Sequence, residues 1–452
     1  MAVEFSTEQL NRRWVYLRSL EGQIKGGILA AGFGKRLDPF TTSLRPKPLF
    51  PLGGKVPIIQ QWVDTFVRAG ITQVSMNTCV LKEEVRAQFQ SGEKDGINIQ
   101  YAEEEVPTGT FGGAAKQFLG NRAKLVGPGE LPLPFAPFQG STMIIPSGDI
   151  ITNFGAEDLE RMYDLHKRSG AAMSLILTPI PWDRRGDFGT VTLDRPQRLG
   201  GRLDSFGQIS SFVEKDPNSP SNLNNASIYM LDRGLVEELD KFRTEASRDV
   251  AEPFYDFGQH VFPALLGKLR YVTLPRDFTM TGITYTGRWF DIGKKPEYLE
   301  VNRSILDGEF DIHLPYAKFP GGYLGHSVSI DFSKVTIRPP VVIGNNCIIE
   351  PGATIGPYAV VGDGWRIGRN VDVSYSVMWQ RYPFYTKDGR VISIEERKAV
   401  DAHEVRDGVG IFHSIVSGGT IDGDLHNQVA NPLEDGSVQI LSLDYVPTGP
   451  RA

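Results

Sequence analysis

A glycine-rich segment followed by two cations is the part of the sequence best suited to chemistry. Residues 26–59 read GGILAAGFGKRLDPFTTSLRPKPLFPLGGKVPII, an apolar strand that ends in small residues whose backbone N–H groups can approach a ligand closely. Arg36 and Lys47 follow this loop. Arginine grips phosphate oxygens bidentately and lysine adds a point charge, so the pair suits a triphosphate. The segment matches neither the P-loop nor the GxGxxG fingerprint, and the loop alone fits a tight strand-to-helix turn equally well.

Two aspartates follow apolar runs in distant parts of the sequence. Asp149 ends the block IIPSGD, and Asp291 follows YTGRWF. Ligands of open α/β folds bind at the carboxyl ends of parallel strands, where such aspartates would lie. Carboxylate oxygens suit Mg²⁺, which usually takes one or two of them together with phosphates and waters. Either aspartate by itself fits a turn or a helix cap instead.

Three further blocks place polar or small residues at the ends of expected elements. SFVEKDP carries Glu214 and Lys215, NNASIYML carries Asn225, and PTGTFGGA carries Gly109. An adjacent Glu–Lys pair is ordinarily a solvated strand face, and a glycine-rich run ordinarily opens a helix. The order of the blocks along the chain is therefore a stronger indication of function than any single block.

Taken together, these blocks resemble the sugar-phosphate nucleotidyltransferases, or NDP-sugar pyrophosphorylases. That family opens with GxGxRLxPLT followed by a PKP segment, here GFGKRLDPFT and RPKP. The resemblance implies an enzyme that transfers a nucleoside monophosphate from an NTP to a sugar 1-phosphate and releases pyrophosphate. Mannose-1-phosphate guanylyltransferases and glucose-1-phosphate nucleotidyltransferases are resembled about equally, and we favour GTP with mannose 1-phosphate. An inactive subunit that binds nucleotide sugar remains the alternative from another class.

The resemblance also implies a role for each matched residue. Three cations would act in catalysis: Arg36, Lys47 and Lys215. The nucleotide would contact Leu29, Ala30, Gly32, Gly34 and Gly109, with Gly109 against the base. The sugar phosphate would contact Glu214, Lys215 and Asn225, and Asp149 and Asp291 would hold Mg²⁺. Ser227 stands where the family usually has the glycine of its NAG block, which leaves the shape of the sugar pocket open.

The elements that must position these residues follow from the hydrophobic pattern. Residues 23–307 alternate short apolar runs with helical stretches, which predicts a three-layer, Rossmann-like α/β domain with a mostly parallel sheet. Residues 186–232 predict hairpin-like strands in an antiparallel insertion. Residues 1–22 predict a helical extension ahead of this catalytic domain.

Residues 308–452 change to a period of six. Apolar residues recur at Ile337, Ile343, Ile349, Ile355, Val361, Ile367 and Val373. Three hexads per coil are typical of a parallel β-helix, here predicted to be left-handed, with an excursion at 379–410. Similar β-helices form acyltransferases, which usually need a catalytic histidine. Residues 337–378 contain no histidine, so we favour a structural or oligomerising role for this β-helix.

The composition bounds the remaining function classes. The net charge of −6 argues against nucleic acid as the main partner. No run reaches the roughly 18 apolar residues that a membrane span needs, so no membrane association is expected. The two cysteines suit reduced thiols and a cytoplasmic location. The β-helix predicts a homo-oligomer, because solenoid surfaces and ends are commonly buried between subunits.

Overall fold

The computed structural model describes residues 24–43, 45–120, 138, 140–246, 256–269, 272–275, 277–379, 403–433 and 437–445. The predicted helical extension at 1–22 and residues 380–402 of the predicted excursion lie outside them. Of the described residues, 24–32, 62–82 and those between 88 and 289 form one compact unit. A second unit contains 33–61, 83–87 and the described residues from 290 onward. The predicted boundary at Asp307 stays a prediction.

The first unit is built on a nine-stranded mixed sheet with the order β5-β4-β1-β6-β11-β8-β12-β10-β9. Its strands are β1 (Ile24–Leu29), β4 (Gln73–Thr78), β5 (Asn98–Glu103), β6 (Thr142–Pro146), β8 (Met173–Pro179), β9 (Gly189–Arg198), β10 (Leu203–Glu214), β11 (Leu223–Asp232) and β12 (Met280–Tyr285). Strands β5, β4, β1 and β6 are mutually parallel, and β8 runs parallel to β12. The predicted α/β class is therefore confirmed.

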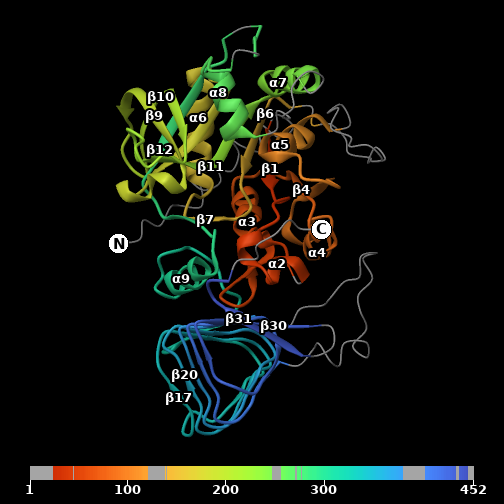
Figure 1. The fold of residues 1–452 in the computed structure, drawn as a ribbon, viewed down its shortest axis with the longest axis vertical. Coiled ribbons are helices and arrows are strands. Elements are labelled where there is room, and N and C mark those ends of the chain that lie inside the picture. Colours follow the sequence, from red (N-terminus) through yellow and green to blue (C-terminus); the bar gives the residue numbers. More distant parts are fainter. Residues whose placement is uncertain are drawn as a thin grey trace, which may run out of the picture. The chain divides into compact units, whose positions relative to one another are not determined.

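Helices cover both faces of this sheet (Figure 1). They are α3 (Gln60–Arg68), α5 (Gly109–Leu119), α6 (Ala156–Ser169), α7 (Arg233–Ala246) and α8 (Phe262–Leu265). Most of α4 (Lys82–Phe89) belongs to the second unit. Successive residues of a strand point to opposite faces. A Cβ atom on Gly26 would lie 2.8 Å from Phe66 of α3, whereas one on Gly27 would lie 3.1 Å from Gln117 of α5. These two helices therefore pack closely on opposite sides of β1, which gives three layers.

The segment predicted as an antiparallel insertion divides between two places. Strands β9 and β10 pair as a hairpin at the sheet edge, as expected. Strand β11 instead lies between β6 and β8 and runs antiparallel to both. Its run Ile228–Leu231 is apolar and buried, which suits a strand covered on both faces. The sheet is consequently more mixed than the sequence pattern indicated.

The second unit contains the parallel β-helix, whose coils stack as a triangular prism (Figure 1). One sheet contains β14 (Ala317–Phe319), β15 (Gly322–Leu324), β18 (Val341–Ile343), β21 (Ala359–Val361), β24 (Val377–Met378), β27 (Ile415–Val416), β30 (Gln428–Pro432) and β31 (Val438–Ser442). Another contains β16 (Ser329–Ile330), β19 (Ile348–Ile349), β22 (Arg366–Ile367), β25 (His403–Val405) and β28 (Gly419–Ile421). The third contains β17 (Thr336–Ile337), β20 (Thr354–Ile355), β23 (Asp372–Ser374), β26 (Gly410–Phe412) and β29 (Leu425–His426).

The register of the coils confirms the predicted repeat. Ile337 lies opposite Ile355, and Ile355 lies opposite Val373, so the same face recurs after three hexads. Beyond the excursion the stacking resumes, since Ile367 pairs with Val405. The periodic residues form one core with Cys347, Ala353 and their neighbours. The hexad period therefore determines both the coil length and the inward face.

The second unit also contains the segments that carry the predicted phosphate-binding residues. These are the 3₁₀ turns η1 (Lys35–Leu37) and η2 (Lys47–Leu49), the helix α2 (Phe40–Ser43), the strands β2 (Pro51–Leu52) and β3 (Val56–Pro57), and the helix α9 (Lys295–Leu306). Aromatic rings pack these segments against the β-helix. Trp379 follows β24 of the β-helix, and its ring centroid lies 4.8 Å from that of Phe40 and 4.9 Å from that of Phe50. The segments that carry the predicted phosphate-binding residues and the β-helix therefore share one packed unit.

Replacing Trp365 by alanine tests how much the β-helix depends on a bulky side chain in its core. Trp365 is fully buried, and its Nε1 donates to the Trp379 carbonyl oxygen at 2.7 Å. The lost burial and the resulting cavity should lower the free energy of unfolding by about 3–5 kcal/mol, measured by urea denaturation with circular dichroism. Ile348→Ala, on the adjacent strand but 44% exposed, is the matched control and should cost far less. Equal losses in both variants would contradict the assigned role of Trp365.

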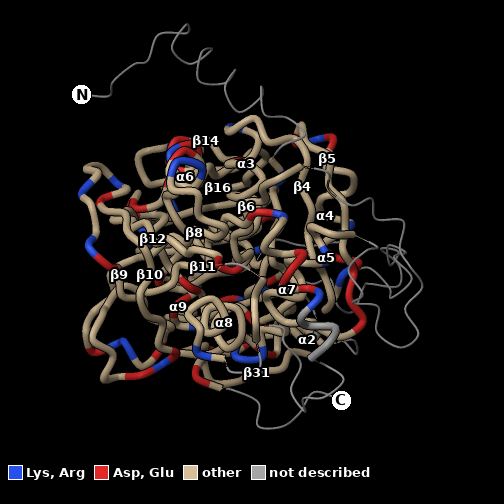
Figure 2. The backbone as a smooth tube through the Cα atoms, turned by 90° about the horizontal axis from the view of Figure 1, so that it is seen from above, with Lys and Arg blue, Asp and Glu red and all other residues tan. Residues whose placement is uncertain are grey.

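Charges of both signs are interspersed along the β9–β10 hairpin (Figure 2), whose residues 194–204 include Asp194, Arg195, Arg198, Arg202 and Asp204. Such a mixed surface differs from the basic stripe of a nucleic-acid interface. Among the helices that the structure describes, none combines the length and the apolar character needed to cross a bilayer.

Candidate active site

Three of the predicted blocks meet at one edge of the first unit's sheet. The N–H of Gly148 donates to the Leu29 carbonyl oxygen at 2.8 Å, which joins the end of β1 to the loop after β6. The N–H of Ser147 donates to the Ser227 carbonyl oxygen, also at 2.8 Å, which joins that loop to β11. The Ser147 hydroxyl donates to Asp149 Oδ1 at 2.6 Å. The glycine-rich loop, Asp149 and the expected sugar-binding block thus lie together, at the carboxyl ends of β1 and β6.

The loop after β1 is only partly open to a ligand. Leu29 and Ala30 are buried, and the Ala30 N–H donates to Asn77 Oδ1 at 2.8 Å. A Cβ atom on Gly32 would meet nothing within 4 Å, so the space beside this residue is open. Gly34 has a φ of 59°, a left-handed conformation that glycine adopts without steric cost. Gly32 is therefore better placed to face a ligand than Ala30.

A buried carboxylate links this loop to the predicted base-binding glycine. Glu104 is 1% exposed, and its Oε1 accepts from Asn77 Nδ2 at 2.9 Å. Its Oε2 accepts from the backbone N–H of Thr108 at 2.7 Å and from the Thr108 hydroxyl at 3.0 Å. Burial raises the pKa of Glu104, although these hydrogen bonds oppose the shift. Gly109, with a φ of 72°, begins α5 directly after Thr108.

Sequence reasoning missed Asn77 and Glu104. Asn77 is the last residue but one of β4, the strand beside β1, and Glu104 is the middle residue of a run of three glutamates. Nothing local distinguishes Glu104 from its neighbours, of which Glu105 has a 69% exposed side chain. Asn77 lies opposite Leu29 in the parallel pair of β1 and β4. A predicted pairing of these two strands would therefore have placed Asn77 beside the glycine-rich loop.

Glu214 and Lys215 lie at the end of β10, as predicted. Lys215 Nζ is 3.9 Å from Glu214 Oε1, and its side chain is 64% exposed. Burial raises the pKa of Glu214; Lys215 opposes this shift and Asp256 adds to it. Lys215 has a φ of 49°, a left-handed conformation that costs a non-glycine residue about 1–3 kcal/mol. The ammonium group is thus exposed at the end of a residue with a left-handed backbone.

Asn225 lies beside a bulge in β11 that explains the family's usual glycine. The register with β8 shifts between Asn225 and Tyr229. Ser227, within this bulge, has a φ of 56°, a value that favours glycine. Asn225 Oδ1 accepts from the Ser227 N–H at 3.1 Å, and its Nδ2 donates to the Tyr229 hydroxyl at 2.9 Å. Serine at 227 therefore keeps the backbone form that glycine would adopt.

The remaining predicted residues meet within the second unit. Lys47 Nζ lies 3.2 Å from Asp291 Oδ1, and the Lys47 side chain is only 8% exposed. Arg36 is exposed, and a Cβ atom on Gly293 would lie 3.1 Å from its Nη1. Glu297 Oε2 accepts from the N–H groups of Gly293 and Lys294 at 2.7 and 2.8 Å, which fixes the turn after Asp291. Arg36, Lys47 and Asp291 are therefore assembled around the start of α9.

A model of nucleotidyl transferases matches residues 25–308 of this chain, which contain every residue of the predicted site. The chain belongs to the nucleotidyl transferase family. That membership confirms the relationship predicted from the order of the motifs. The matched range covers the sheet, the phosphate loop and α9, and it stops before the β-helix.

Curated relatives extend the similarity of this nucleotidyl transferase beyond that range. A UTP–glucose-1-phosphate uridylyltransferase of Synechocystis sp. is 27% identical over 79% of this chain and 83% of the relative. A mannose-1-phosphate guanylyltransferase of Mycobacterium tuberculosis is 27% identical over 76% and 81%, respectively. A glucose-1-phosphate adenylyltransferase of Deinococcus radiodurans is 27% identical over 66% and 70%.

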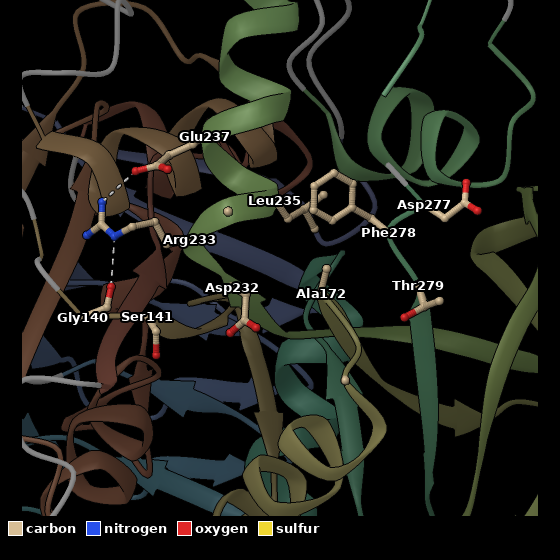
Figure 3. A pocket seen from close by; sticks show the side chains of 12 residues that line it. Gly140, Ser141, Ala172, Asp232, Arg233, Leu235, Glu237, Asp277, Phe278 and Thr279 are labelled. Atoms are coloured by element: carbon tan, nitrogen blue, oxygen red, sulfur yellow. Dashed lines mark hydrogen bonds and ion pairs between the residues drawn. The ribbon is translucent and has the colours of Figure 1, made fainter. Parts of the chain in front are cut away.

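A cavity of about 510 Å³ in this nucleotidyl transferase (Figure 3) lies away from the predicted site residues. It is lined by Ser141, which precedes β6, by Ala172, which precedes β8, and by Asp232, which ends β11. Asp149 follows β6, so the cavity lies at the opposite edge of the sheet. Arg233, in its wall, pairs with Glu237 at 3.3 Å and donates to the Gly140 carbonyl oxygen at 3.1 Å. This cavity is separate from the candidate active site.

Proposed function

We propose that this chain transfers a nucleoside monophosphate from an NTP to a sugar 1-phosphate and releases pyrophosphate, with GTP and mannose 1-phosphate as the preferred pair. An oxygen of the sugar phosphate attacks the α-phosphorus in line. The new P–O bond replaces the bond to pyrophosphate, which leaves. The nucleophile is already an anion, so the protein needs to align two polyanions and neutralise charge rather than supply a strong base.

The observation that carries the proposal is the close pairing of Lys47 and Asp291 beside Arg36. The 3.2 Å contact between Lys47 Nζ and Asp291 Oδ1 holds the ammonium group in a largely buried position. Charge on a fixed, poorly solvated cation acts more strongly than charge in water. Lys47 would hold the α-phosphate and the departing pyrophosphate, and Arg36 would hold the β- and γ-phosphates. The base would lie against Gly109.

We propose Mg²⁺ as the cofactor, held by Asp149 and Asp291. The family resemblance assigns both carboxylates to this role, and carboxylate oxygens are the donors that Mg²⁺ prefers. Among the described residues, no group of three or more His, Cys, Asp and Glu side chains could enclose a metal ion. That fits an ion that takes its remaining ligands from phosphates and water. When bound, the ion would orient the phosphates and offset their charge.

Replacing Lys215 by alanine separates sugar binding from chemistry. We propose that its exposed ammonium binds the phosphate of the sugar, while Glu214 accepts hydrogen bonds from sugar hydroxyls and Asn225 also contacts the sugar. Lys215→Ala should therefore raise the KM for sugar 1-phosphate roughly 10-fold or more, since a charge-assisted contact contributes about 1.5–3 kcal/mol. The KM for the NTP should change little, as initial-rate kinetics of pyrophosphate release would show. An unchanged sugar KM would remove Lys215 from this role.

A matrix of substrates tests the proposed function itself. Pyrophosphate release would be measured for ATP, GTP, CTP, UTP and dTTP against mannose, glucose and related sugar 1-phosphates. The proposal expects the highest kcat/KM for GTP with mannose 1-phosphate. A preference for glucose 1-phosphate with another NTP would keep the reaction and change the substrates. No release with any pair, from a chain that binds nucleotide sugar, would identify a non-catalytic subunit.

We further propose that the enzyme works in the cytoplasm as a homo-oligomer, without nucleic-acid or membrane partners. Cys79 and Cys347 are both free, which suits a reducing compartment. Oligomers would bury part of the β-helix surface. Light scattering at micromolar concentration should give at least a dimer. A fully active monomer would contradict the assembly while leaving the chemistry unaffected.

A further inference from the structure

One lysine outside the predicted site lies where three backbone segments of the second unit converge. Lys295 is the first residue of α9 and is 1% exposed. Its Nζ donates to the carbonyl oxygens of Arg36 at 3.2 Å, Asp38 at 3.0 Å and Tyr445 at 2.5 Å. An ammonium group has three N–H donors, so the three carbonyl groups match its full capacity.

Burying the Lys295 ammonium group costs free energy, because the charge loses its hydration. Its hydrogen bonds must therefore compensate for that loss. Burial lowers the pKa of Lys295 to about 8, while the carboxylates of Asp38 and Asp444 partly oppose the shift. A buried ammonium is tolerated when hydrogen bonds and nearby charge compensate for lost hydration. Here the compensation comes from main-chain oxygens, which fix the backbone itself rather than one side chain.

The first two carbonyl groups belong to the loop that carries Arg36. In this loop the Leu37 N–H donates to the Gly34 carbonyl oxygen at 2.8 Å, and the Thr41 hydroxyl donates to Asp38 Oδ1 at 2.6 Å. Lys295 adds the link from this turn to α9. The Arg36 residue is exposed, so the position of its side chain depends on how firmly the backbone that carries it is held.

The third carbonyl group belongs to the C-terminal end of the described chain. Strand β31 pairs with β30, and the Leu443 N–H donates to the Asn427 carbonyl oxygen at 2.8 Å. Tyr445 follows two residues later, with its side chain 40% exposed and its carbonyl oxygen on Lys295. The contact is to the main chain, so it does not depend on the identity of the Tyr445 side chain.

We propose that Lys295 is a positioning residue that ties the segment Asp444–Tyr445 to the Arg36 loop, so that this segment sets the affinity for the nucleotide phosphates. This inference rests on the proposed role of Arg36 in NTP binding. Lys295 does not touch substrate in this scheme. It acts by holding the Arg36 backbone where the guanidinium meets the β- and γ-phosphates.

Two independent variants break the tie from its two ends. Lys295→Met removes the ammonium group and keeps an unbranched side chain. A chain that stops after Leu443 removes the Tyr445 carbonyl and leaves Lys295 intact. Each should raise the KM for the preferred NTP about 10-fold, the effect of losing roughly 1.4 kcal/mol of binding, while the KM for sugar 1-phosphate stays within about twofold. Lys295→Met in the shortened chain should be little worse than Lys295→Met in the full chain, because the methionine variant already lacks all three hydrogen bonds.

Three matched controls should leave both KM values unchanged. Tyr445→Ala keeps the carbonyl oxygen that Lys295 contacts. A chain that stops after Pro447 keeps the whole contact and removes only the last residues. Lys334→Met removes a lysine of the same unit whose side chain is 62% exposed and pairs with Asp331 at the surface. Circular dichroism would establish that each variant is folded.

Hydrogen exchange separates this inference from the proposed reaction. Backbone amides of residues 34–38 should exchange faster in Lys295→Met and in the chain ending at Leu443 than in the parent, whether or not any substrate is turned over. Unchanged exchange and an unchanged NTP KM in the shortened chain would overturn the tie, even if Lys295→Met failed to fold. A parent chain that releases no pyrophosphate would overturn the proposed function, and the exchange measurement would still decide the tie.

Discussion

Lys47→Ala should lower kcat roughly 100- to 1,000-fold, the usual effect of removing one fixed group that stabilises charge in the transition state. The side chain is 8% exposed and its Nζ lies 3.2 Å from Asp291, so the ammonium group occupies a fixed and poorly solvated position. The loss should fall on kcat more than on the KM for the NTP, because the charge moves onto pyrophosphate only during the reaction. Single-turnover measurements of pyrophosphate formation would show it directly.

Lys55→Ala is the matched control for that variant. Lys55 also belongs to the second unit and also pairs with an aspartate, Asp363, at 2.6 Å, but it is 32% exposed and lies outside the proposed site. Partly exposed ion pairs contribute little to stability, so kcat should stay within about twofold. A comparable loss in both variants would mean that Lys47 acts through folding, and a normal kcat in Lys47→Ala would remove it from the reaction.

Asp149→Asn and Asp291→Asn should each lower kcat/KM by about 100-fold or more, which corresponds to at least roughly 2.7 kcal/mol of transition-state stabilisation. The substitution keeps the size of the side chain and removes the negative charge that Mg²⁺ requires. If both residues act through one ion, the double variant should be little worse than either single variant. Initial rates over a range of Mg²⁺ concentrations would measure all three.

Metal dependence distinguishes this role from a structural one. Raising Mg²⁺ or supplying Mn²⁺ should partly restore either single variant. Asp291 has a second role open to it, because it pairs with Lys47 and is followed by a capped helix turn. If Asp291→Asn kept a normal Mg²⁺ requirement while Asp149 remained essential, Asp291 would orient Lys47 and another group would complete the metal site.

The buried Asn77–Glu104–Thr108 contacts extend the site beyond the residues that would touch substrate. They join the loop after β1 to the start of α5 through hydrogen bonds of 2.7–3.0 Å. A side chain held this way fixes the relative position of two ligand-binding turns. In the second unit, Lys295 has a comparable role, because its ammonium group donates to the backbone carbonyl oxygens of Arg36 and Asp38.

The sequence by itself determined the features that depend on local periodicity. The hexad repeat predicted the inward residues of the β-helix, and Ile337, Ile355 and Val373 do stack in register. The alternation of apolar runs and helical stretches predicted the α/β layers. The predicted strand boundaries placed Asp149 after β6 and Lys215 at the end of β10, where the structure has them. The ends of strands follow directly from such boundaries.

The tertiary structure alone decided which distant residues meet and which polar groups are buried. Strand β11 lies between β6 and β8, although its sequence pattern equally fits an edge hairpin. Glu104 and Lys295 resemble their charged neighbours in sequence and differ from them only because the fold surrounds them with donors or acceptors. Burial of a polar group depends on partners supplied by remote segments, as Tyr445 does for Lys295. No local pattern records such partners, so these residues became visible only in the folded chain.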